Sequence, residues 1–231
     1  ACGVPILNRG GRAYSSSGEP LRLMYAGRLQ EKQKRISDLI KLADKLSALE
    51  VNYVLEIYGS GDAAAIRSYT SQLAGLDADT QRRVEFVGEI SVERIRQKWA
   101  RADVCLLTSE YEGTSVSMLE AMAEGCVPVV TAVSGTGAVI QHGENGFQHG
   151  VGALDAFAES ISFLARRRDV LATMGRAAQL RVQEHHSLDH YVDWFVTLIP
   201  ALWASPPRRW PTGRELIQHP ASVRRFLDEQ A

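Results

Sequence analysis

The most informative segment of the chain reads Glu112-Gly113-Thr114-Ser115-Val116-Ser117-Met118-Leu119-Glu120. It places two carboxylates eight positions apart around a loop of small residues. One apolar run, residues 103–108, precedes it and another, residues 127–131, follows it closely. This order predicts a strand, a loop, a helix and a second strand. In a parallel sheet such a loop lies at the carboxyl end of its strand, where open α/β folds bind ligands.

The predicted helix start suits a phosphate group. Backbone N–H groups of Thr114, Ser115 and Val116 would point out of the first turn, and such a terminus attracts anions. Glu112 lies before the helix, whereas Glu120 lies about 2.2 turns further along, inside it. The two carboxylates are therefore expected to play separate roles, one at the mouth of the site and one facing a ligand from the helix.

Composition narrows the class of protein. The chain has 231 residues, 45% of them hydrophobic, and a formal net charge of -1, which suits one or two globular domains. Because the charges nearly balance, no overall field favours nucleic acid or an anionic membrane. Cys2, Cys105 and Cys126 show no C-x-x-C spacing, so we expect reduced, mostly buried thiols. Without an apolar stretch of about 18–20 residues or a leader pattern, we expect a soluble, cytoplasmic protein.

Strand-like and helix-like runs alternate along the chain. Residues 1–20 are rich in Gly, Ser and Pro and predict a linker. Residues 21–203 form the predicted domain, a Rossmann-like parallel sheet with helices on both faces, and residues 204–231 form a tail with a helix near 213–229. The predicted strands are residues 21–26, 53–58, 84–87, 104–107 and 127–130, and the predicted helices are 36–49, 63–73, 92–100, 115–124, 153–166, 169–184 and 188–203.

Two cations follow the first predicted strand. Arg28 and Lys34 are six residues apart and can both reach a diphosphate, Arg as a planar fork and Lys as a point charge. Taken alone, the pair also fits an ordinary solvated loop. Their place on the same sheet edge as Glu112 favours the binding role.

Three other motifs have structural alternatives. Gly59-Ser60-Gly61-Asp62 lacks the third glycine of a dinucleotide fingerprint, which favours a tight turn with Asp62 as helix cap. Residues 86–90 end the third strand and offer either a wall for a flat base, at Gly88 and Ile90, or a plain strand end. The histidines at 185, 186 and 190 lack accompanying carboxylate or thiol ligands, so no metal is expected. Neither a serine-hydrolase elbow nor a P-loop is present.

Together these motifs are similar to those of family 4, or group 1, glycosyltransferases. The resemblance rests on Gly27-Arg28-Leu29 with Lys34, on residues 86–88, and on residues 109–130 with their E-x7-E spacing. It covers roughly residues 21–200 and matches the carboxyl-terminal half of a two-domain enzyme of the GT-B type. It implies a domain that binds a nucleotide diphosphate sugar in a transferase that retains the anomeric configuration, without a metal or other cofactor.

The resemblance also implies individual roles. Arg28 and Lys34 would hold the diphosphate and stabilise it as it leaves, which makes them catalytic together with Glu112. Glu112 would contact hydroxyls of the donor sugar, and Glu120 would accept hydrogen bonds from the ribose. The implied donor-binding residues are Gly27, Arg28, Lys34, Gly88, Ile90, Glu112, Gly113, Thr114, Ser115, Val116 and Glu120.

The implied partners are a UDP-, GDP- or ADP-linked sugar and a glycan, lipid or small-molecule acceptor. In the family an amino-terminal domain binds the acceptor, so we expect this chain to be a fragment with little activity alone. Ala138 stands where the family often has an acidic residue. Two alternatives are a nucleotide-sugar sensor or inactive scaffold, and half of a nucleotide-sugar 2-epimerase. The tail, with Arg208 and Trp210, is expected to brace the other domain, with peripheral membrane contact as the alternative.

Overall fold

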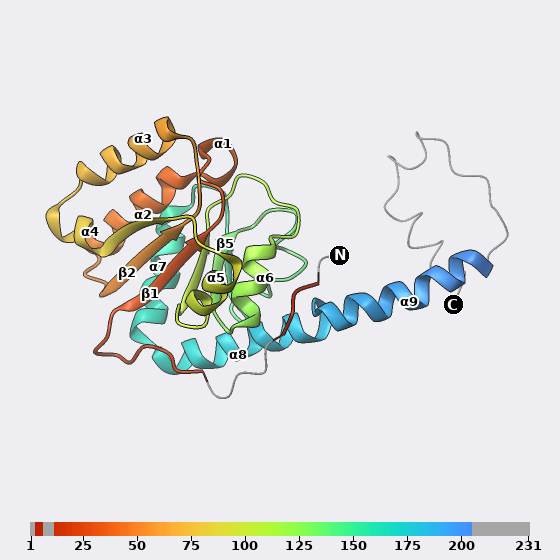
Figure 1. Ribbon diagram of the computed structural model, residues 1–231. Helices are drawn as coiled ribbons and strands as arrows, with labels where there is room; N and C mark the ends of the chain where they lie inside the picture. The colour runs from red at the N-terminus through yellow and green to blue at the C-terminus, as the bar shows by residue number, and fades with distance from the viewer. Residues whose placement is uncertain (1–2, 7–11, 205–231) are drawn as a thin grey trace. The chain divides into compact units, whose positions relative to one another are not determined.

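A computed structural model of the protein describes residues 3–6 and 12–204. Six parallel strands form one sheet in the order β3-β2-β1-β4-β5-β6 (Figure 1). The strands are β1 Leu21–Ala26, β2 Tyr53–Tyr58, β3 Val84–Gly88, β4 Val104–Leu107, β5 Val127–Thr131 and β6 Phe147–His149. The predicted fold class is thereby confirmed.

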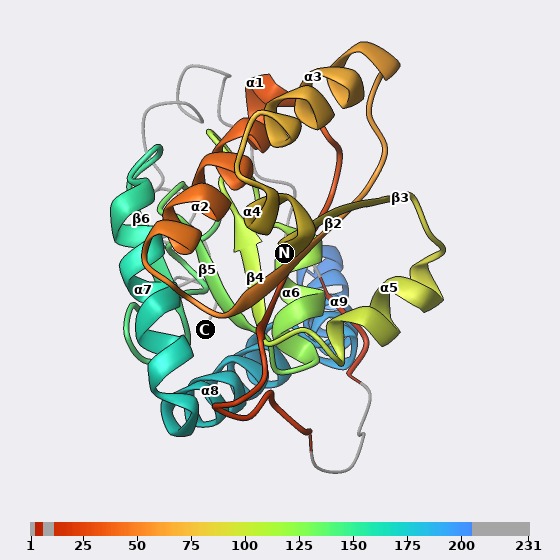
Figure 2. The same ribbon diagram turned by 90° about the vertical axis from the view of Figure 1, so that its left-hand side faces the viewer.

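Helices cover both faces of the sheet. Figure 2 shows α2 and α7 on one side of the strands and α5 and α6 on the other. This arrangement places every loop after a strand at the same edge, as expected for parallel βα units. The helices are α1 Glu31–Lys34, α2 Ile36–Ala48, α3 Ala63–Ala74, α4 Ala78–Arg83, α5 Val92–Trp99, α6 Val116–Ala123, α7 Leu154–Arg166, α8 Arg168–His185 and α9 Leu188–Ala204.

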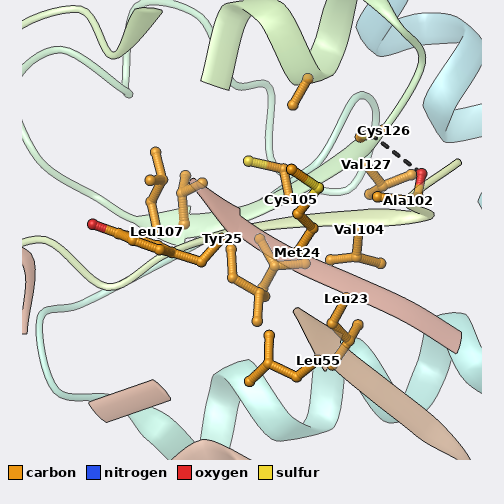
Figure 3. Packing of buried hydrophobic residues seen from close by; sticks show 14 of the residues in the cluster. Leu23, Met24, Tyr25, Leu55, Ala102, Val104, Cys105, Leu107, Cys126 and Val127 are labelled. Atoms are coloured by element: carbon orange, nitrogen blue, oxygen red, sulfur yellow. Dashed lines mark hydrogen bonds between the residues drawn. The ribbon is translucent and has the colours of Figure 1, made fainter. Parts of the chain in front are cut away.

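The central strands are buried because both faces are covered. Every residue of β4 and β5 is buried, and their unbroken apolar runs are typical of strands in a two-sided parallel sheet. Figure 3 shows β1 side chains, among them Leu23, packed with Val104 and Cys105 of β4. Cys105 and Cys126 are free and buried, as predicted, whereas Cys2 lies outside the described residues.

Three elements were not predicted. α1 and α4 are too short and polar to show apolar periodicity, and β6 is a three-residue edge strand of sequence Phe-Gln-His. β6 is defined by pairing with β5, where Val129 lies opposite Phe147. Such a strand depends on its neighbour in space, so a local pattern cannot reveal it.

The linker predicted at residues 1–20 makes fixed contacts in its described parts. Val4 pairs with Ser187 in a parallel bridge, and Ser15 is buried against Asp103, the residue before β4. The Arg12 guanidinium donates to the carbonyl of Trp99 at 3.3 Å, among other acceptors. Ser15 and Arg12 therefore attach to the amino-terminal edge of the sheet, before β4.

The described residues up to Tyr191 form one compact unit, and those from Val192 onward belong to a second. The described part of the second unit is residues 192–204, most of α9, where Val196 and Trp203 are exposed apolar side chains. The predicted helix at 213–229 and the residues Arg208 and Trp210 lie outside the described residues. Over residues 3–6 and 12–204, no helix combines the length and apolar character that a bilayer span requires.

Candidate donor-binding site

Arg28 is an exposed cation of the site that no described carboxylate neutralises. It follows Gly27 directly after β1, and the Tyr25 hydroxyl donates to the Arg28 carbonyl at 2.8 Å, which fixes the backbone there. The exposed guanidinium donates to a neutral group, the Gln33 side-chain oxygen, at 3.1 Å. No described carboxylate pairs with Arg28. Its charge is therefore available to an anion.

Lys34 ends α1 and is brought to the loop after β4 by backbone contacts. The Thr108 hydroxyl donates to the Lys34 carbonyl at 2.9 Å, and the Glu110 N–H donates to the Gln33 carbonyl at 2.8 Å. Arg35, the next residue, adopts a left-handed conformation with φ 50°, which ends α1 abruptly. The turn between α1 and α2 is thus fastened to the segment that carries Glu112.

Lys34 and Glu112 form an ion pair through Nζ and Oε1, across 78 residues of sequence. Both side chains are largely buried, with exposed fractions of 13% for Lys34 and 8% for Glu112. The buried Ser109 hydroxyl donates to the same Glu112 oxygen at 2.7 Å. Sequence reasoning placed both charged residues at this edge, but it predicted neither their pairing nor the role of Ser109.

The start of α6 is capped and tied to β1. Ser115 is the N-cap, and its hydroxyl accepts from the Met118 N–H at 3.4 Å. The Ser117 hydroxyl donates to the Ala26 carbonyl at 2.7 Å, so the helix begins beside the end of β1. Within the described part of the chain, the N–H groups of Thr114 and Val116 have no hydrogen-bond partner. These two N–H groups belong to the set that was predicted to bind an anion.

The loop after β5 supports Glu112 from behind. A Cβ on Gly135 would lie 1.4 Å from the Gly113 carbonyl oxygen, so this close approach admits only glycine. The Ser134 hydroxyl donates to the Glu112 carbonyl at 3.2 Å. Ala138, at the position that is often acidic in the resembling family, is exposed, and its carbonyl accepts from Arg181 at 3.0 Å. The side chain at this position therefore offers no carboxylate to a ligand.

A pocket of about 220 Å³ opens beyond the ends of β1, β2 and β3. Three predicted residues, Gly27, Arg28 and Ile90, line it together with Ala26, Tyr58, Gly59, Ser60, Glu89 and Ile95. Gly88 is not in the lining, but its carbonyl accepts from the Gly59 N–H at 2.9 Å. The Lys34–Glu112 pair and residues 113–116 lie outside this lining.

The Gly59–Asp62 segment has both a structural and a pocket role. Asp62 caps α3 by accepting from the Ala65 N–H at 2.8 Å, as predicted. Gly59 has φ 139°, and a Cβ there would lie 1.8 Å from the Gly27 carbonyl oxygen. The glycine thus allows two strand ends to approach closely. This role in the pocket was missed, and the only signal for it was the glycine at the strand end.

The side chain of Glu120 makes no hydrogen bond or ion pair to a described protein group. It lies on α6 and is partly buried, and burial raises the pKa of its carboxyl while the charge of Arg96 acts in the opposite direction. Among the described residues, none gives its carboxylate a hydrogen bond or ion pair. Its acceptor capacity therefore remains for a ligand. No group of three or more potential metal ligands occurs in the described residues.

A family model described as "Glycosyl transferases group 1" matches residues 20–167. N-acetyl-alpha-D-glucosaminyl L-malate synthase of Bacillus anthracis is 30% identical over 168 residues, which cover 72% of this chain and 42% of that protein. The chain therefore spans less than half the length of this relative.

Solved structures share the fold. HepE of Anabaena, in complex with UDP-glucose, superposes with a TM-score of 0.71 at 20% identity, covering 80% of this chain and 50% of that chain. The carboxyl-terminal domain of the group 1 protein LpcC from Francisella tularensis gives a TM-score of 0.63 at 14% identity, covering 74% of this chain and 88% of that chain. With the family match over most of the α/β unit, these findings show that the chain belongs to the group 1 glycosyltransferases.

Proposed function

We propose that this chain is the donor-binding domain of a retaining glycosyltransferase that uses a nucleotide diphosphate sugar. The observation that supports this most strongly is the convergence of Arg28, Lys34, Glu112 and the free start of α6 at one sheet edge. Cations and helix N–H groups complement a diphosphate, whereas a carboxylate beside them accepts from sugar hydroxyls.

Each part of the donor has a counterpart in the site. The pocket lined by Gly59 and Ile90 takes the nucleobase, and Glu120 accepts hydrogen bonds from the ribose hydroxyls. Arg28, Lys34 and the N–H groups at the start of α6 hold the diphosphate. Glu112 contacts hydroxyls of the transferred sugar. This assignment follows the order base, ribose, diphosphate and sugar from β3 towards β5.

The chemistry proposed for the site is stabilisation of the leaving group. As the bond between sugar and diphosphate breaks, negative charge grows on the diphosphate oxygens. Fixed cations and helix dipoles aimed at these oxygens lower the barrier because they are already oriented. Arg28 and Lys34 supply this charge in our proposal, without a metal ion.

The acceptor site is assigned to the rest of the protein. The chain covers 42% of the Bacillus anthracis relative and 50% of HepE, which leaves room for a second domain. We therefore expect little transfer by this chain alone. A full-length protein should transfer the sugar to an acceptor, whereas a sensor would only bind the donor and a 2-epimerase would convert it without an acceptor.

Titration calorimetry of the chain against UDP, GDP, ADP and their hexose conjugates tests donor binding. One nucleotide series should bind, and affinity should fall as salt rises. Arg28→Ala should weaken binding by about 1.5–3 kcal/mol, the range for a hydrogen bond to a charged group. Arg82→Ala is the matched control, because Arg82 lies on α4, before β3 and at the opposite sheet edge. Equal affinity of Arg28→Ala and wild type would contradict the assignment.

A further inference from the structure

We infer that the Lys34–Glu112 ion pair makes the donor site distinguish a nucleotide sugar from the free nucleoside diphosphate that remains after transfer. The inference rests on the proposed function, because it assigns Lys34 to the diphosphate and Glu112 to the sugar. It adds a preference that neither assignment contains. The ratio of affinities for the nucleotide sugar and for the free nucleoside diphosphate is shifted towards the nucleotide sugar, beyond what their charges alone would give.

The geometry shows two binding groups that satisfy each other while no ligand is present. Lys34 Nζ contacts Glu112 Oε1, and Ser109 donates to the same oxygen. Within the described residues, Glu112 Oε2 has no donor and Lys34 Nζ has no second acceptor. Because only 8% of the Glu112 side chain is exposed, water is a poor substitute for a lost partner. Removing one partner of a buried pair is strongly unfavourable for this reason.

A diphosphate competes directly for Lys34. When Lys34 Nζ turns towards phosphate oxygens, its contact with Glu112 weakens, and the carboxylate keeps only the Ser109 hydroxyl. The added phosphate charge also repels the carboxylate. Binding of the free diphosphate therefore leaves the buried Glu112 carboxylate without its cation, which is unfavourable.

A nucleotide sugar compensates for the same loss. Its sugar hydroxyls are hydrogen-bond donors, and Glu112 Oε2 is an acceptor that no described residue contacts as a donor. Hydroxyl groups that donate to this oxygen replace the interaction that Lys34 gives up. The sugar thus replaces Lys34 as a partner of Glu112, whereas the free diphosphate has no group that can do so.

Arg28 provides an internal contrast. Its guanidinium is exposed and bonded to the neutral Gln33, so it can bind a diphosphate without leaving any carboxylate unpaired. Of the two cations, it is therefore Lys34 that distinguishes the nucleotide sugar from the free diphosphate. After transfer, the same imbalance favours release of the nucleoside diphosphate.

Glu112→Gln tests the inference, with calorimetry of the nucleotide that binds wild type and of its hexose conjugate. The variant keeps the shape and the Ser109 contact but removes the negative charge. The free diphosphate should bind more tightly, on the order of tenfold, because no buried charge is uncovered. The conjugate should bind more weakly, on the order of tenfold, because a hydrogen bond to a charged acceptor is lost.

Glu120→Gln is the matched control. Ribose is common to both ligands, so this variant should weaken both in the same direction. Unchanged or weaker binding of the free diphosphate by Glu112→Gln would overturn the inference. If no nucleotide or conjugate binds wild type, the proposed function itself fails, which is a different result.

Ser109→Ala gives an independent test that keeps both charges. Without this hydroxyl, Glu112 has no protein donor once Lys34 turns to the phosphate. The free diphosphate should lose more affinity than the conjugate, opposite to the shift in Glu112→Gln. A merely structural defect would weaken both ligands alike, and equal losses in a variant whose melting curve matches wild type would also overturn the inference.

Discussion

The two ends of β4 each carry a buried carboxylate paired with a cation and a serine, yet the two differ in how fully they are satisfied. Asp103, before the strand, is completely buried. Arg22 donates to both its oxygens, Nη2 to Oδ1 at 2.8 Å and Nε to Oδ2 at 3.0 Å. The Ser15 hydroxyl and the N–H groups of Ser15 and Arg22 complete the set. Among the described residues, Glu112, after the strand, accepts only from Lys34 and Ser109, both on one oxygen.

This difference separates a carboxylate that holds the fold from one that is ready to bind. Burial alone would raise the pKa of Asp103, but the hydrogen bonds from Arg22 and Ser15 outweigh it and keep that pKa below its usual value. Asp103 has no capacity left for a ligand. Glu112 retains a free oxygen and a cation that can leave it, and it stands at the carboxyl edge where parallel sheets bind ligands.

The largest expected effect is on folding. Asp103→Ala removes a completely buried acceptor and leaves Arg22 and two N–H groups without it, which should lower the free energy of unfolding by about 3–5 kcal/mol. Urea unfolding followed by circular dichroism measures the change. Glu112→Gln should lower it much less, because the glutamine amide oxygen can still accept from Lys34 and Ser109. Similar losses in the two variants would remove the distinction between the two ends.

Glu120, which has no protein donor among the described residues, sharpens the comparison with Asp103. Glu120→Ala should weaken binding of both the free nucleotide and its sugar conjugate by about 1.5–3 kcal/mol, the range for hydrogen bonds to charged groups. It should barely change the free energy of unfolding, since no hydrogen bond or ion pair of the carboxylate to a described residue is lost. Calorimetry and a melting curve on the same sample report both quantities. A large drop in stability would place Glu120 with Asp103 as a structural group.

A smaller effect is expected from acid. Since the folded-state pKa of Asp103 is lowered, its network stabilises the folded state above the ordinary carboxyl pKa of about 3.9. That contribution is lost as pH falls through the lowered pKa. The stability gap between wild type and Asp103→Asn should therefore narrow below about pH 4 in urea titrations. A gap that stays constant down to the acid unfolding range would show that the charge of Asp103 contributes nothing.

The smallest effect is expected from an exposed pair. Lys45 of α2 and Asp155 of α7 contact at 2.5 Å, with exposed side-chain fractions of 39% and 85%. Asp155→Ala should change the free energy of unfolding by no more than about 1 kcal/mol, because water screens the pair. The same urea assay sets this baseline. A loss approaching that of Asp103→Ala would mean that burial is not what distinguishes these pairs.

Local pattern was sufficient for the framework of the fold. The bounds predicted for the strands at 21–26, 53–58 and 104–107 agree with β1, β2 and β4, because buried strands between turn residues carry a strong local signal. Arg28, Lys34 and Glu112 were assigned to one sheet edge because each follows a parallel strand. That assignment needed only the order of elements.

The contacts within the site required the tertiary structure. Nothing local in the sequence indicates that Lys34 meets Glu112 from 78 residues away, or that Ser109 points to that carboxylate. The approach of Gly135 to Gly113 likewise depends on two loops meeting. The role of Gly59 in the pocket could not be predicted for the same reason. In sequence, a glycine needed for a turn cannot be distinguished from a glycine needed for close approach of a neighbouring strand end.

The ion pair also crosses the seam where the strand order reverses. β1 and β4 are hydrogen-bonded neighbours, with Leu23 opposite Val104, although a long stretch of chain that includes β2 and β3 separates them. Lys34 belongs to the half that begins with β1, and Glu112 to the half that begins with β4. A donor bound by both residues, as proposed, would connect the two halves. Such binding would stabilise the folded sheet by mass action, and backbone amides on both sides of the seam should then exchange more slowly with solvent.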